Sequence, residues 1–268
     1  MIIFDGLYSF ISLALTMLSL YINNFMAKKE LDKYPFGKYI LEPLVISLKS
    51  LIIGGMCLYS LIGAIQDIVN GGNSVEYGSA LIYSIVSVVG CGGVYIFMKK
   101  KGEKISSEMV KVEASQWLMD TLLSIGVLVG FVIAMILRNT RFAWLNVYID
   151  PMMVIMVSVV FIKMPIQSFI NSFKEILCVK ANDEINDDIY FIVKEIEKEY
   201  KFEDSISRVS KIGGELRIEI DFIYNEESKL KDLDQMDCVR EEVYDAIKHI
   251  DYNKWLNVSF TGDKKWAI

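Results

Sequence analysis

Three polar residues at the start of a long apolar run share one face of a predicted helix. Gln116, Asp120 and Ser124 are spaced four residues apart, so on a helix they form one polar stripe. The apolar run continues from 125 to 137. A carboxylate inside a membrane-spanning helix is costly and by default indicates a functional site. The alternative is that Asp120 lies at the helix end and is simply hydrated.

A second pair of oxygen-bearing residues has the same spacing at the start of the chain. Asp5 and Ser9 open the first apolar run four residues apart. If the two helices face each other in a bundle, two carboxylates and two neutral oxygens converge on one point. Such a cage suits a divalent cation, so the sequence predicts a metal site formed by Asp5, Ser9, Gln116 and Asp120.

The elements that must position these residues are membrane helices. The chain of 268 residues is 53% hydrophobic, against about 45–50% in soluble domains. Five apolar runs reach the roughly 20 residues needed to cross a bilayer: 2–26, 43–68, 77–98, 112–137 and 147–172. We therefore predict a membrane α-helical bundle of five transmembrane helices over residues 1–176. A small cytoplasmic α+β domain, ferredoxin-like or metallochaperone-like, is expected over 177–268.

Lysine and arginine in the loops predict the orientation in the membrane. Loops 27–42 and 99–111 are rich in lysine, whereas loop 69–76 has neither residue and loop 138–146 has two arginines. Positively charged loops remain in the cytoplasm, so the first two loops and the C-terminal domain are expected there. This orientation puts the N-terminus outside, and we expect that a first membrane helix is missing from this sequence.

The C-terminal part reads as a helix layer on a sheet. Helical periodicity and strand-like alternation predict helix, strand, strand, helix and strand in this order: 183–200, 205–211, 215–224, 229–249 and 255–260. Gly213 and Gly214 are expected to form the turn between the first two strands.

Several function classes find no support in the sequence. The net charge of −6 argues against nucleic acid as a partner, which favours a basic face. The four cysteines contain no paired motif, and the single histidine, His249, is expected to be a surface or capping residue. No nucleophile–base pair or cofactor motif is apparent, so we predict neither an enzyme nor a bound cofactor.

The order of motifs resembles the cation diffusion facilitator (cation efflux) family. The resemblance covers nearly the whole chain apart from the family's first membrane helix. Five segments carry it: Asp5-Gly-Leu-Tyr-Ser9, Tyr34-Pro-Phe-Gly-Lys-Tyr-Ile-Leu-Glu42, Gln116-Trp-Leu-Met-Asp120 followed by Ser124, Asp150-Pro151, and Ser172-Phe-Lys-Glu-Ile-Leu177. The resemblance implies a homodimeric exporter in the plasma membrane that exchanges cytoplasmic divalent cations for protons across the lipid bilayer.

The sequence departs from the family pattern at several ligand positions. Ser9 replaces a carboxylate, Gln116 replaces His or Asp, and Tyr34 and Lys38 stand where histidines would bind a second metal. The remaining membrane ligands carry oxygen only, which favours manganese, iron(II) or magnesium over zinc. The alternative is a transport-inactive, degenerate paralogue that acts as a membrane scaffold or regulatory partner.

Overall fold

The computed structural model describes residues 2–28, 30, 32–72, 77–105, 108–138, 141, 143–230 and 232–267. Within this part, the side chains of residues 2–13 lie outside what is described. Contacts between Cα atoms divide the chain into two compact units. The first unit comprises Met1–Lys29 and Leu44–Phe173, and the second comprises Glu30–Pro43 and Lys174–Ile268. Loop 30–43 therefore groups with the C-terminal residues, whereas the sequence had suggested one boundary at 176.

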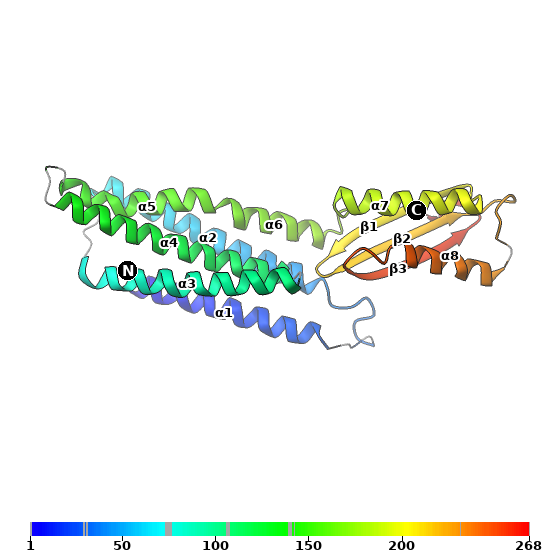
Figure 1. Cartoon of the computed structure of the whole chain (residues 1–268), viewed down its shortest axis with the longest axis horizontal. Coiled ribbons are helices and arrows are strands. Elements are labelled where there is room, and N and C mark those ends of the chain that lie inside the picture. Colours follow the sequence, from blue (N-terminus) through cyan, green and yellow to red (C-terminus); the bar gives the residue numbers. More distant parts are fainter. Residues whose placement is uncertain are drawn as a thin grey trace. The chain divides into compact units, whose positions relative to one another are not determined.

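The first unit is a bundle of long helices (Figure 1). Its elements are α1 (Ile2–Met26), α2 (Leu41–Val69), α3 (Tyr77–Ile105), α4 (Glu108–Arg138), the 3-10 turn η1 (Ala143–Leu145), α5 (Asn146–Phe161) and α6 (Lys163–Ile176). Helix α4 packs along α3 on one side and along α5 on another. Each of the five predicted apolar runs forms helix, with the last run divided between α5 and α6.

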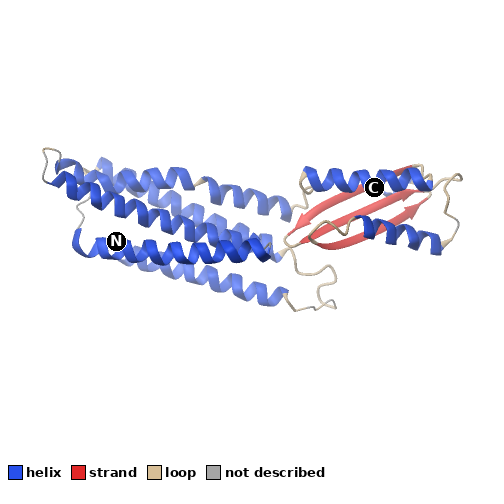
Figure 2. Cartoon of the chain, viewed as in Figure 1, coloured by secondary structure: helices blue, strands red, loops and turns tan. Residues whose placement is uncertain are grey.

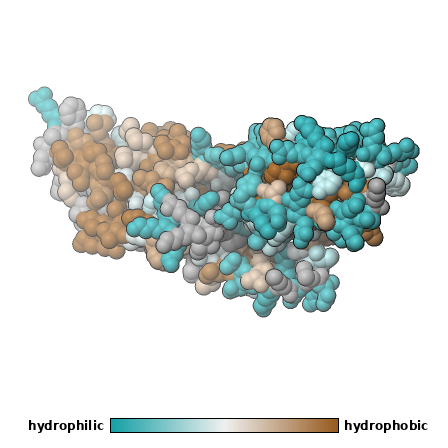
Figure 3. Space-filling view, turned by 45° about the vertical axis from the view of Figure 1, so that its right-hand side comes forward, coloured by the Kyte–Doolittle hydropathy of each residue, from teal (hydrophilic) through white to brown (hydrophobic). Residues whose placement is uncertain are grey.

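Three stretches of the described residues are long and apolar enough to cross a membrane: Leu41–Val69, Val110–Leu137 and Ala143–Ile176. Many of their exposed side chains are large and apolar, and Figure 3 shows hydrophobic residues gathered on the surface of this unit. Exposed apolar surface of this extent suits contact with lipid rather than water. The runs 2–26 and 77–98 form α1 and α3, and their assignment as spans stays a prediction.

A proline explains why the last run is divided. Pro165 has no backbone N–H, so it cannot donate to the carbonyl of Phe161, and α5 ends at that residue. The amides of Ile162 and Ile166 still donate to Ser158 and Ile162, at 2.9 and 3.4 Å. The helical path therefore continues across a local break.

The second unit is a three-stranded sheet covered by two helices (Figure 2). Its elements are α7 (Asp183–Tyr200), β1 (Asp204–Ile212), β2 (Glu215–Ile223), α8 (Leu233–Ala246), β3 (Asn253–Thr261) and the 3-10 turn η2 (Lys264–Ala267). Strand β2 lies in the centre, antiparallel to β1 and parallel to β3. The order of helices and strands matches the sequence prediction. Among the described residues the sheet has three strands, rather than the four of a ferredoxin-like unit.

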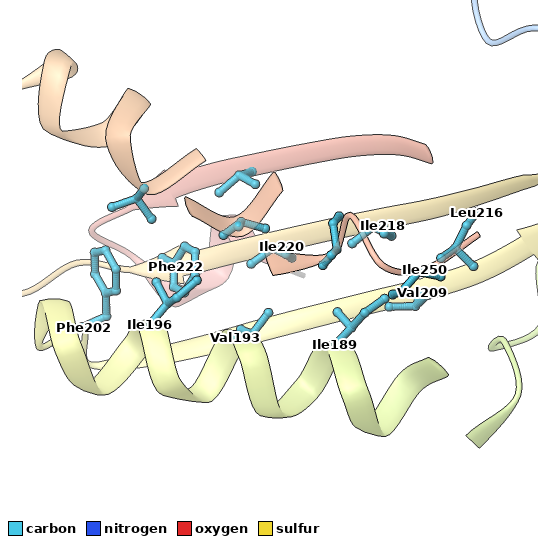
Figure 4. Close-up of a cluster of buried hydrophobic side chains, with 14 of the residues drawn as sticks. Ile189, Val193, Ile196, Phe202, Val209, Leu216, Ile218, Ile220, Phe222 and Ile250 are labelled. Carbon is cyan, nitrogen blue, oxygen red and sulfur yellow. The ribbon is translucent and has the colours of Figure 1, made fainter. Parts of the chain in front are cut away.

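One face of the sheet and both helices enclose the core of this unit (Figure 4). Alternate residues of β2 point to the same face, and this face carries Leu216, Ile218, Ile220 and Phe222, all fully buried. Helix α7 supplies Ile189, Val193 and Ile196 to the same cluster, and α8 supplies Val239 and Val243. Both helices therefore cover one face of the sheet.

The opposite face of the sheet is held by polar contacts. Asp221 is buried there and accepts hydrogen bonds from Arg208, at 2.7 Å, and from the hydroxyl of Ser259. These bonds join β1, β2 and β3. Asp221 is therefore a structural residue of the sheet.

The turn between β1 and β2 approaches loop 30–43 closely. Gly213 has a φ of +57°, and a Cβ atom at this position would lie 2.8 Å from the carbonyl oxygen of Tyr39 and 2.7 Å from Oε2 of Glu42. The guanidinium of Arg217 donates to the carbonyl of Phe36 at 3.1 Å. These contacts explain why the loop belongs to the second unit.

We expect Gly213→Ala to destabilise the second unit by about 1–3 kcal/mol, because alanine is strained in the left-handed region and collides with the loop. The matched control is Gly214→Ala, where the nearest atom would lie 3.7 Å away. Limited proteolysis of loop 30–43 should become faster in the first variant alone. Equal proteolysis rates in both variants would contradict this assignment.

His249 joins the first half of α7 to the end of α8. Its Nε2 lies 2.7 Å from Oδ2 of Asp188, and its Nδ1 lies 2.8 Å from the carbonyl oxygen of Ala246, the last residue of α8. Only the imidazolium carries a proton on both nitrogens and can donate both bonds. Asp188, and then the carbonyl of Ala246, therefore raise the pKa of His249 above its ordinary value.

The stability of this unit should depend on pH through His249. Because the pKa of His249 is raised in the folded state, the protonated imidazole stabilises the folded unit fully below the unfolded pKa of about 6.5. This stabilisation is lost as the pH rises through the pKa of the folded state. The chain has a single histidine, so NMR of labelled imidazole reports this pKa directly. The Asp188→Asn variant should lower it, and an unchanged pKa would contradict the contact.

Candidate metal site

Helix α4 carries a polar stripe through an apolar segment. Along one side lie Glu113 and Gln116, both buried, and Asp120, which is half-buried. The hydroxyl of Ser124 donates to the carbonyl of Asp120 at 2.8 Å, and that of Thr121 donates to Trp117 at 2.7 Å. These hydroxyls bond to the backbone of their own helix, as is usual in apolar surroundings. The stripe thus presents two carboxylates and one amide.

The four predicted ligands come from two helices. Gln116 and Asp120 lie in α4, and Asp5 and Ser9 lie near the start of α1. The side chains of Asp5 and Ser9 lie outside the described part of the structure. Among the residues that are described, no three Asp, Glu, His or Cys side chains lie close enough together to hold a metal.

A hydrogen bond between described residues relates α1 to α4. The hydroxyl of Thr16 in α1 donates to Oε2 of Glu113 in α4, at 3.5 Å. The two helices run in opposite directions (Figure 1). Residues that lie before Thr16 in α1 are therefore level with residues that follow Glu113 in α4.

This register relates the predicted ligands to each other. Ser9 lies seven positions before Thr16, and Asp120 lies seven positions after Glu113. Seven residues make about two helical turns and about 10 Å of rise, so each residue stays on the same side of its helix. On regular helices, positions 9 and 120 are therefore expected at one level, about two turns from the contact of Thr16 with Glu113.

A buried ion pair lies next to this contact. The ammonium of Lys49, in α2, is 1% exposed and pairs with the Glu113 carboxylate, whose side chain is 8% exposed. Together with Thr16, this pair connects α1, α2 and α4. Sequence reasoning missed it, although a single lysine inside the apolar run 43–68 was the signal. Such a charge requires an acidic partner in a neighbouring helix.

A small cavity borders Gln116 within the first unit. It has a volume of about 20 Å³, and its polar lining includes Ser50 of α2, Ser115 and Gln116 of α4, and Ser168 of α6. A cavity of this size holds one water-sized species. Among the described residues, no hydrogen-bond partner is found for the buried hydroxyl oxygen of Ser50. This cavity offers neutral oxygen atoms one helical turn from Asp120.

Loop 30–43 already contains a buried positive charge. The ammonium of Lys38 lies 2.9 Å from Oε2 of Glu30 and 4.8 Å from the ring centre of Tyr34. The side chain of Lys38 is 4% exposed. An ammonium in these contacts opposes a second cation in the loop, as the substitutions at Tyr34 and Lys38 suggested.

Comparison with known proteins decides the family. A sequence profile described as the cation efflux transmembrane domain matches residues 1–177. This chain belongs to the cation efflux family. The magnetosome protein MamB of Magnetospira sp. (strain QH-2) is 21% identical over 247 residues, which cover 92% of this chain and 81% of MamB.

Membership of the cation efflux family confirms the resemblance found in the sequence. Proteins of this family are transporters of metal cations rather than enzymes, and their transmembrane domain is embedded in the bilayer. The chain is therefore an integral membrane protein with a helical transmembrane domain and a C-terminal domain. Intramembrane carboxylates in a cation efflux protein are the natural candidates for contact with the transported ion.

Proposed function

We propose that this protein exports divalent metal cations in exchange for protons, with the ion held by Asp5, Ser9, Gln116 and Asp120. The observation that carries the proposal is the contact between Thr16 and Glu113, because it fixes the register of α1 against α4. That register supports the proposal, because regular helices would then bring the two predicted ligand pairs to neighbouring levels. Two carboxylates balance the charge of one divalent ion and lower the cost of burying it.

The chemistry of the ligands favours a harder ion than zinc. Carboxylate, hydroxyl and amide oxygens suit manganese, magnesium and iron(II), whereas zinc prefers imidazole and thiolate. The proposed cage contains no histidine or cysteine. The transported ion in this proposal is manganese, iron(II) or magnesium.

Proton exchange follows from the same two carboxylates. When the cation leaves, two negative charges remain close together in a medium of low dielectric constant, which favours binding of a proton. When the next cation arrives, it displaces that proton. An Asp120→Asn protein that keeps the full pH dependence of transport would contradict this coupling.

The proposal also includes the membrane, the orientation and the oligomeric state of the protein. The lysine-rich segments 27–42 and 99–111 favour a C-terminal domain in the cytoplasm and an exporter in the plasma membrane. By its family, the protein is expected to act as a homodimer.

A membrane scaffold without transport is the second candidate. The observation in its favour is Lys38, since its buried ammonium lies in a loop where an intact metal site would need negative or neutral ligands. Against it, both intramembrane carboxylates of the proposed cage are present in the sequence. Burying a carboxylate in a membrane helix costs free energy, and a scaffold has no use for such a residue.

Ion flux into vesicles tests the proposal directly. The purified full-length protein is reconstituted, a pH gradient is imposed, and uptake of Mn²⁺, Fe²⁺, Mg²⁺ and Zn²⁺ is compared with that of protein-free vesicles. We expect gradient-driven uptake of at least one of the first three ions, faster than that of Zn²⁺. Faster Zn²⁺ uptake would reject the oxygen cage, and no uptake of any ion would favour the scaffold.

A further inference from the structure

The ion pair between Lys49 and Glu113 is buried and lies about two turns of α4 from Asp120. Glu113 is seven positions before Asp120 on the same side of α4, towards the first residue of this helix, Glu108. Gln116 lies between these two carboxylates along the helix. The cavity beside Gln116 is also lined by Ser50, the neighbour of Lys49 in α2.

Glu113 and its neighbour Thr16 carry oxygen atoms of the kind that bind cations. One carboxylate oxygen faces the ammonium of Lys49, and the other accepts a hydrogen bond from Thr16 at 3.5 Å. A carboxylate and a hydroxyl are oxygen ligands of the kind that divalent cations prefer. The place of the cation is taken by the side chain of Lys49.

The proposed cage and the pair of Lys49 with Glu113 together carry the charge that balances one divalent ion. Asp5, Asp120 and Glu113 supply three negative charges, and Lys49 supplies one positive charge. The remaining two negative charges match a single divalent cation. Without Lys49, Glu113 would compete with Asp120 for the same ion.

We propose that Glu113 and Thr16 form a latent second site for a divalent cation, which the ammonium of Lys49 keeps closed. Lys49 thereby prevents the transported ion from being trapped beside the cage. The inference rests on the proposed function, because it takes Asp5 and Asp120 as the primary site. It assigns a role to a buried pair that the primary site does not use.

Counting bound Mn²⁺ ions tests this assignment without measuring transport. Equilibrium dialysis of the purified full-length protein gives the number of Mn²⁺ ions per chain. We expect Lys49→Gln to bind one Mn²⁺ more than the unchanged protein, and Lys49→Gln/Glu113→Gln to lose that extra ion. Lys49→Arg keeps a positive charge and should bind the same number as the unchanged protein.

A second replacement keeps the test valid if one variant does not fold. Lys49→Met removes the same charge but leaves an apolar side chain of similar length, which suits an apolar helix. One additional Mn²⁺ in either folded variant supports the latent site. An unchanged number of ions in every folded variant overturns it.

The same experiment separates this inference from the proposed function. The primary site fails if Asp120→Asn does not reduce the number of Mn²⁺ ions bound by the otherwise unchanged protein. The latent site fails if removing Lys49 adds no ion, whatever the primary site does. The two results are obtained from different variants.

Discussion

Replacing Asp120 by asparagine should lower Mn²⁺ flux into reconstituted vesicles by at least about 30-fold. Asparagine keeps the shape of the side chain but removes one of the two charges that balance the ion. Losing one partner of a buried charge pair costs about 2–5 kcal/mol, and each 1.4 kcal/mol corresponds to about tenfold. The measurement is the initial rate of pH-driven uptake, and Asp5→Asn should have an effect of the same size.

Two controls make this result specific to the ligand. Ser124→Ala lies one turn further along the same helix and removes a hydroxyl that donates to the backbone of Asp120, so flux should change little. The oligomeric state of Asp120→Asn should equal that of the unchanged protein. If flux persists in Asp120→Asn, or falls equally in Ser124→Ala, Asp120 does not contact the ion.

Replacing Phe222 by alanine should destabilise the second unit by about 3–5 kcal/mol, the usual cost of removing a fully buried phenylalanine. Phe222 is 0% exposed, and its ring lies 4.7 Å from that of Phe202 and 5.8 Å from that of Phe260, between ring centres. Hydrogen exchange of the full-length protein should show faster exchange of amides in β1, β2 and β3. Exchange in α2 and α4 provides the internal reference.

The matched control for this change is Phe191→Ala. Phe191 lies in α7 of the same unit but is 66% exposed. Surface substitutions of this kind stay within about 0.5 kcal/mol. Equal exchange rates for the two variants would show that the cluster in Figure 4 does not stabilise the sheet.

Local signals were sufficient to predict most elements of the second unit. Helix α7 spans the predicted residues because Asn182 caps its first turn, accepting from the amide of Ile185 at 3.3 Å. It ends where Lys201 adopts the left-handed conformation that often follows a helix. Alternation of apolar residues likewise predicted β1 and β2 around the turn at Gly213.

Contacts between distant residues were less accessible to sequence reasoning. The attachment of loop 30–43 to the second unit depends on Arg217 and Gly213, far along the chain, and no local pattern indicates it. The pairing of Lys49 with Glu113 is of the same kind. A charge in an apolar helix implies an oppositely charged partner, so the sequence indicated that Lys49 has one. Which residue is the partner depends on how α2 and α4 pack.

The candidate site could be predicted from the sequence only in part. The spacing of Gln116 and Asp120 predicted one polar stripe, and α4 carries both residues on a continuous helix. The depth of the stripe relative to α1 could not be read from spacing alone. It required one contact between the helices, that of Thr16 with Glu113.

The central claim is that positions 9 and 120 face each other across the bundle. Thiol crosslinking tests it in a full-length protein whose four native cysteines have been replaced. We predict that Ser9→Cys/Asp120→Cys forms an intramolecular crosslink, whereas Phe10→Cys/Asp120→Cys, turned by about 100° around α1, does not. A crosslink that forms only from position 10, or from neither position, would contradict the account.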